Sequence, residues 1–195
     1  MTAHWQYLKY VIRHKWFVFV AGLVVGAPLW RLIVHDWTKF LPRELGPYVM
    51  KFYGKAWRDR YVREGLTQLV LSPAGCPDSA VAMQYVAVIE RRWDASVQRA
   101  FDVAWNHHQK AHAHHWQYWI RVNDNAGPGQ VAALAMSEPA VREMVADWMG
   151  AGRAISGKWE AQAWYDRTKD DKQLHPETRA LAESILARAH AAGRA

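Results

Sequence analysis

The chain contains a single cysteine, Cys76, among its 195 residues. One cysteine cannot form an internal disulfide framework or a cysteine-rich zinc site, and it suits a reducing compartment. The N-terminus also lacks a small-residue cleavage pattern after a short apolar core, so we expect no secretory signal. Both absences lead us to expect a cytoplasmic protein.

Alternating apolar and polar residues, which mark half-buried strands, are scarce along the chain. Apolar residues make up 51% of the sequence and recur mostly at helical spacing. A chain of this length fits one domain with a substantial core. We therefore predict an all-α, single-domain helical bundle, with residues 1–157 as the core and 158–195 as a C-terminal helical extension that packs loosely.

Apolar spacing and breaker residues predict helices at about 4–25, 28–40, 41–53, 57–71 and 79–108. In the fourth of these we expect Tyr61, Val62, Leu66 and Leu69 to point inward. Ser137 with Pro139 indicates the start of a further helix that ends at Gly150 or Gly152. His175-Pro176 opens the last helix. Residues 72–78 and 123–129 are predicted loops, and 131–136 a short extended segment.

Basic residues outnumber acidic ones by 25 to 18, which gives a formal net charge of +7. This excess favours an anionic partner such as a nucleotide, a nucleic acid or a membrane surface. However, no run of five or more basic residues is present. A solvated basic surface is therefore the simpler explanation, and charge alone does not predict nucleic-acid binding.

The longest uncharged stretch, residues 16–30, is shorter than the roughly 20 apolar residues of a membrane-spanning helix. Gly26 and Pro28 within it indicate that one helix ends and another begins. We predict a buried helical hairpin here, and a membrane anchor at 16–34 remains the alternative.

Histidine is abundant, and five of the ten histidines fall within residues 106–116. On a continuous helix, His108, His112 and His115 would share one face. Neutral imidazole is the commonest protein ligand for transition metals, so the cluster predicts metal binding. For any single histidine, a polar helix face or a hydrogen bond to a tryptophan is the simpler explanation.

Two further positions combine ligand chemistry with apolar surroundings. The adjacent pair His35 and Asp36 follows an apolar helical run, and Lys39 lies one turn later, where it can meet a phosphate. Asp147 interrupts an otherwise apolar helix, and a carboxylate there is costly to bury unless it is paired or coordinated. A salt bridge to Arg142 or Arg153 is the alternative for Asp147.

Taken in chain order, His14, His35-Asp36, His107 or His108, His114-His115 and Asp147 resemble the H…HD…H…HH…D pattern of the HD-domain superfamily. Its HD-x-x-K segment is similar to His35-Asp36-Trp37-Thr38-Lys39, and the additional histidines resemble its two-metal members. Three stretches, 13–16 with 28–31, 107–119 and 142–149, also resemble a small phage and bacterial family of unknown function. That likeness covers roughly residues 8–186.

The HD-domain resemblance implies a helical metal-dependent phosphohydrolase that acts on a phosphate monoester or diester, most naturally a nucleotide. It implies one or two divalent ions of Fe, Mn, Ni, Co or Zn, with ligands His14, His35, Asp36, His108, His114, His115 and Asp147. Asp36 would orient a water nucleophile, Lys39 would neutralise phosphoryl charge, and Glu143 would assist as base or as a partner of a ligand. The protein would be located in the cytoplasm of a bacterial cell or of a phage-infected host. The alternative is a non-catalytic metal- or nucleic-acid-binding helical module.

Overall fold

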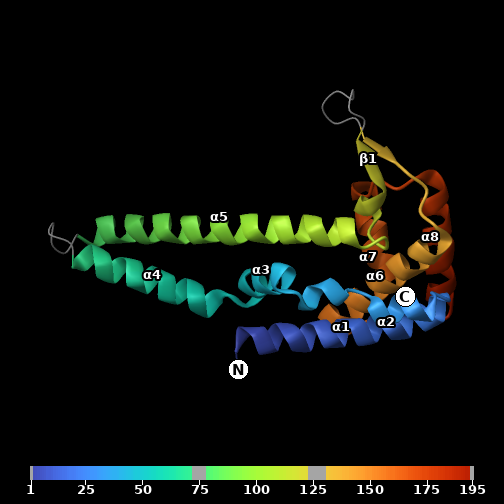
Figure 1. Ribbon diagram of the computed structural model, residues 1–195, viewed down its shortest axis with the longest axis horizontal. Helices are drawn as coiled ribbons and strands as arrows, with labels where there is room; N and C mark the ends of the chain where they lie inside the picture. The colour runs from blue at the N-terminus through green and yellow to red at the C-terminus, as the bar shows by residue number, and fades with distance from the viewer. Residues whose placement is uncertain (1, 72–77, 123–130, 194–195) are drawn as a thin grey trace. The chain divides into compact units, whose positions relative to one another are not determined.

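The computed structural model describes residues 2–71, 78–122 and 131–193 (Figure 1). Within these residues the chain forms eight α-helices and one two-stranded sheet, so the predicted all-α fold is confirmed. The helices are α1 (Ala3–Val25), α2 (Leu29–Val34), α3 (Pro42–Tyr53), α4 (Lys55–Val70), α5 (Ser79–Ala111), α6 (Glu138–Ser156), α7 (Ala161–Thr168) and α8 (Pro176–Ala191). In this part of the chain, no helix has the length and apolar character needed to cross a membrane. Cys76 and the predicted loops at 72–77 and 123–129 lie outside the described residues.

The chain divides into two compact units. The first comprises Met1–Leu8 and Phe40–Asn106, and the second comprises Lys9–Lys39 and His107–Ala195. The C-terminal helices α7 and α8 belong to the same unit as α6.

The first unit is built on a pair of helices, α4 and the N-terminal part of α5, which lie side by side (Figure 1). Arg58 on α4 pairs with Asp94 on α5 at 3.2 Å, and the rings of Tyr61 and Trp93 lie 5.2 Å apart. No residue of α4, which is described along its whole length, is buried. The expectation that its apolar residues point into a core is therefore wrong, because they pack only partly against a neighbouring helix.

The second unit has a continuous apolar core centred on α6. Val141, Met144, Val145 and Met149 recur at three- and four-residue spacing and are almost fully buried. The last helix, α8, contributes Ala182, Ile185, Leu186 and Ala189 to the same core. The loose packing expected of the C-terminal segment is therefore wrong, because small and branched residues allow α8 to pack closely on α6.

The close approach of α1 to α6 explains the glycine at position 150, inside α6. A Cβ at position 150 would lie 2.5 Å from the backbone nitrogen of Val18, so only glycine fits at this crossing. The predicted end at Gly150 or Gly152 is wrong, and α6 ends at Ser156 with Gly157 in the left-handed region (φ 78°).

The predicted break between the first two helices is confirmed at Gly26, which has φ 70°. The N–H of Ala27 donates to the carbonyl of Gly22 at 2.9 Å, which closes the helix end in a Schellman motif. The second helix was expected to reach Phe40, but α2 ends at Val34 and a 3₁₀ turn, η1 (Trp37–Phe40), follows.

The sheet is a hairpin of β1 (Ile120–Val122) and β2 (Val131–Ala133), paired antiparallel with Ile120 opposite Ala133. The extended segment predicted at 131–136 is thus confirmed for its first three residues. Its partner strand, β1, was not predicted, because three residues are too few to show an alternating pattern.

The two glycines of α6 form a matched pair for testing the helix crossing. We expect Gly150→Ala to lower the free energy of unfolding by about 1–3 kcal/mol, because the added methyl group overpacks against α1. Gly152→Ala should raise it by roughly 0.5–1 kcal/mol, because nothing lies within 4 Å of a Cβ there and glycine weakens a helix interior. Urea unfolding measures both, and equal stabilities for the two variants would contradict the crossing.

Candidate metal centre

The centre begins where α2 ends, at a local backbone distortion. Asp36 has φ 56° and is the one non-glycine residue in the described ranges with a positive φ. This conformation costs about 1–2 kcal/mol for most residues, and aspartate is among the few that tolerate it. Lys15 Nζ donates to the carbonyls of Ile33 and His35 and so satisfies the end of α2. The distortion places both members of the pair in one site, with His35 Nε2 3.4 Å from Asp36 Oδ2.

One group of ligand atoms assembles around Asp36 Oδ2. His14 Nε2, from α1, lies 3.1 Å from this oxygen and 3.2 Å from Asp147 Oδ1, on α6. His35 Nε2 lies 3.4 Å from the same Asp147 oxygen. The crossing at Gly150 explains this meeting, because His14 is one turn before Val18 on α1 and Asp147 is one turn before Gly150 on α6.

The alternative salt bridges for Asp147 are wrong. Arg142 pairs with Glu138 at 2.6 Å, and the guanidinium of Arg153 lies over the rings of Phe17 and Trp159. The partners of Asp147 are histidines, as a shared metal ion would require.

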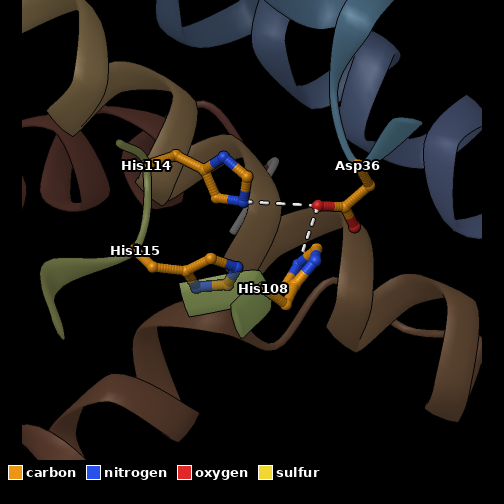
Figure 2. A group of neighbouring side chains, drawn as sticks. All are labelled: Asp36, His108, His114 and His115. Carbon is orange, nitrogen blue, oxygen red and sulfur yellow. Dashed lines mark ion pairs between the residues drawn. The ribbon is translucent and has the colours of Figure 1, made fainter. Parts of the chain in front are cut away.

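A second group assembles around the other oxygen of the same carboxylate. Asp36 Oδ1 lies 3.1 Å from His108 Nε2 and 3.4 Å from His114 Nε2. Figure 2 shows Asp36 and His114 pointing toward each other, with His108 and His115 beside them. One nitrogen or oxygen from each of these four residues lies within 4.8 Å of the others.

The histidine cluster reaches this group by a turn and not by one helical face. α5 ends at Ala111, three residues past the predicted end, so the condition under which His108, His112 and His115 would share one helical face is not met. The amide of His115 donates to the carbonyl of His112 at 3.1 Å, and Trp119 Nε1 donates to the carbonyl of Ala113 at 2.8 Å. These bonds close a tight turn that a straight helix would not allow.

The structure brings all seven predicted ligands into two groups that share Asp36. They are His14, His35 and Asp147 on one side of the carboxylate and His108, His114 and His115 on the other. Of the two neighbouring candidates, His108 belongs to a group, whereas His107 belongs to none of the groups found among the described residues.

Glu143, from α6, forms a third cluster behind two of the ligand rings. Its Oε1 lies 3.1 Å from Nδ1 of His35 and 3.1 Å from Nδ1 of His114. Its Oε2 accepts a hydrogen bond from Arg31 Nε at 2.6 Å. A neutral imidazole has one donor and one acceptor nitrogen, so rings that present Nε2 to a metal must donate from Nδ1. The position of Glu143 is therefore that of a hydrogen-bond acceptor for the ligands, and not that of a third ion site.

Lys39 lies at the edge of the centre, on η1. Its Nζ is 2.5 Å from Asp36 Oδ2. The side chains of Lys39 and Asp147 are 11% and 16% exposed, whereas those of His14, His35, Asp36, His108 and His114 are at most 2% exposed. Lys39 and Asp147 thus form a partly exposed edge beside Asp36 Oδ2.

Sequence reasoning missed two residues that support the site, Arg31 and Thr38. Arg31 holds Glu143, and Thr38 Oγ1 lies 3.3 Å from His108 Nδ1 and 2.7 Å from His112 Nε2. Thr38 lies two residues after Asp36, inside the segment that resembles HD-x-x-K. The sequence gives no sign that its side chain is buried. No pattern in the sequence marks Arg31, because its partner is 112 residues away.

Opposing effects set the protonation of the centre. Burial raises the pKa of Asp36, but His35, Lys39 and His108 outweigh burial and hold it well below its usual range. Burial and Lys39 lower the pKa of His14, yet its hydrogen bonds to Asp147 and Asp36 outweigh both effects and raise it. Histidine binds metal in its neutral form, so a divalent ion would displace protons from these rings.

The donor set fits one or two divalent ions. Asp36 Oδ1 and His114 Nε2 are buried and make no well-directed hydrogen bond to any residue that the structure describes. Buried polar atoms normally have a partner, and a bound ion would be the partner of these two atoms. Imidazole and carboxylate donors without a thiolate suit Fe, Mn, Co, Ni or Zn.

Comparison with known proteins gives one family and no closer relative. No curated protein and no solved structure matches the chain significantly. Residues 3–188 match a family that is described as a family of unknown function (DUF5662). This agrees with the resemblance of the sequence to a small family of unknown function. Because the match spans nearly the whole chain, the protein belongs to this family.

Proposed function

We propose that the protein is a metal-dependent phosphohydrolase that acts on a phosphate monoester or diester, with a nucleotide as the substrate class. The observation that carries the proposal is the shared carboxylate of Asp36, whose two oxygens each face a separate set of ligands. A carboxylate between two such sets is the arrangement of a two-metal site, and phosphatases and nucleases commonly use such sites. The resemblance of the H…HD…H…HH…D pattern to the HD-domain superfamily supports the same reaction.

The geometry supports an assignment of the residues that would hold the ions. His14, His35 and Asp147 would hold one ion, and the other would be held by His108, His114 and His115, with Asp36 contributing to both. A divalent ion bound there would lower the pKa of a water molecule and would neutralise charge on a phosphoryl group. The chain's own task is to keep Asp36 ionised and to hold the imidazole rings in the orientation that presents Nε2 to the ion.

Lys39 is the residue we assign to the phosphate. Its ammonium group lies beside Asp36, on the exposed side of the centre, and it donates hydrogen bonds to anionic oxygens. In the free protein Asp36 holds this group in place. The net charge of +7 would also attract an anionic substrate such as a nucleotide.

The partial exposure of the centre distinguishes a catalytic site from a purely structural metal site. Structural sites enclose the ion with protein ligands, whereas catalytic sites keep a position open for water or substrate. Here one ligand of each group is partly exposed, Asp147 in the group around Oδ2 and His115 in the group around Oδ1, and Lys39 is 11% exposed beside Oδ2. We therefore favour catalysis over the non-catalytic module.

Asp36→Asn should abolish both metal binding and hydrolysis. The neutral amide has one acceptor oxygen and cannot serve both ligand groups, so bound metal should fall below one ion per chain. Hydrolysis should fall by more than about 100-fold, because even residues that only support ligands are worth 10–100-fold. Elemental analysis after expression with Mn²⁺, Co²⁺, Ni²⁺ or Fe²⁺ measures the metal, and a panel of nucleotides and nitrophenyl phosphates measures turnover.

The matched control is Asp166→Asn on α7, an exposed aspartate in the same unit that bonds Gln162. It should leave metal content and turnover unchanged. Wild-type turnover by the Asp36→Asn protein would refute the proposed mechanism.

Lys39→Met should separate phosphate binding from metal binding. We expect the metal content to be retained and hydrolysis to fall by about 10²–10³, because one charge-stabilising donor is lost. Lys158→Met, at an exposed position, is the control. Steady-state kinetics on the metal-loaded proteins provides the measurement. An unchanged kcat/KM for Lys39→Met would contradict the assignment of Lys39 to the phosphate.

A further inference from the structure

We propose that Glu143, held by Arg31, is a positioning residue that couples the two halves of the metal centre, so that they take up their ions together. The inference rests on the proposed two-ion centre and adds to it a mechanism for its assembly. It concerns metal uptake and not the hydrolytic step.

Glu143 contacts one ligand from each half through a single oxygen. Its Oε1 lies 3.1 Å from Nδ1 of His35, which belongs to the half with His14 and Asp147. The same oxygen lies 3.1 Å from Nδ1 of His114, which belongs to the other half. The ring centroids of His35 and His114 lie 4.4 Å apart.

Asp36 closes this arrangement into a ring of four side chains. On the side of the imidazoles away from Glu143, His35 Nε2 lies 3.4 Å from Asp36 Oδ2 and His114 Nε2 lies 3.4 Å from Asp36 Oδ1. Both rings thus stand between two carboxylates, with Nδ1 donating to Glu143 and Nε2 directed to the metal side. A movement of Glu143 would disturb both halves at once.

Arg31 keeps Glu143 charged. Its Nε donates to Glu143 Oε2 at 2.6 Å, and the Glu143 side chain is only 5% exposed. A buried carboxylate needs such a partner to remain charged. Arg31 also lies on α2, the helix that ends directly before His35, so the pair holds that helix end against α6.

The other ligand histidines do not share this acceptor. His108 Nδ1 lies 3.3 Å from Thr38 Oγ1, and His14 Nδ1 has no hydrogen-bond acceptor among the residues that the structure describes. The coupling therefore passes through His35 and His114. An ion that orders one of these rings also fixes Glu143, which then presents the other ring at a smaller entropic cost.

Titration with Co²⁺ tests this coupling without an activity assay. Visible absorption reports the ligand geometry of each ion, and elemental analysis counts the ions. For the wild type we expect two equivalents per chain in a single cooperative transition. In Glu143→Gln the one carbonyl oxygen can accept from the histidines or from Arg31 but not from both, so both ions should bind about 10–100-fold more weakly and in separate steps.

Three further variants make the test specific. Arg31→Gln should reproduce part of the loss, whereas Arg31→Lys, which keeps a cation for Glu143 Oε2, should restore uptake toward the wild type. Glu138→Gln is the matched control, because Glu138 is an exposed glutamate on the same helix and pairs with Arg142. It should titrate like the wild type. Far-UV circular dichroism verifies the fold, and if Glu143→Gln does not fold, the two Arg31 variants decide.

The outcomes separate this inference from the proposed function. Wild-type affinity for both ions in Glu143→Gln would overturn the coupling and leave the proposed hydrolase intact. Loss of only one ion would also overturn it, because Glu143 would then serve a single half. A wild type that binds no Co²⁺ would overturn both the coupling and the two-ion centre.

Discussion

The structure of the second unit depends on the burial of one carboxylate, that of Asp36. Removing a carboxylate from water costs several kcal/mol unless charged and hydrogen-bonding partners replace the solvent. Asp36 obtains those partners from four separate segments: α1, the end of α2 with η1, the end of α5, and the turn after it. Because no single segment can satisfy both oxygens, the site exists only when the whole unit has folded.

Each local irregularity of this unit serves that convergence. Gly150 lets α6 touch the backbone of α1, which brings Asp147 to His14. The left-handed Asp36 ends one helix and starts a 3₁₀ turn, so adjacent ligands face the same point. Backbone strain of this kind persists only where surrounding contacts fix it, and it is concentrated at functional sites.

The sequence predicted which side chains come together better than it predicted the backbone that positions them. The resemblance to the H…HD…H…HH…D pattern named His14, Asp36 and Asp147, and the structure places these three in one group. The helix break at His35 and the turn after Ala111 were not predictable, because helical spacing continues through both and tertiary contacts end the helices. Arg31 was missed for the same reason, since its partner is distant in the chain.

The centre is asymmetric, and the asymmetry carries the functional argument. On the Nδ1 side of the histidines, Glu143 and Thr38 fix the rings, and Arg31 neutralises Glu143. On the opposite side, Lys39 and Asp147 keep partial exposure beside Asp36 Oδ2. A site that only stabilised the fold would gain nothing from leaving a cation and a carboxylate accessible to solvent. A partly exposed edge that carries Lys39 is what the proposed hydrolysis of a phosphate ester would use, because the ligands must stay fixed while substrates exchange.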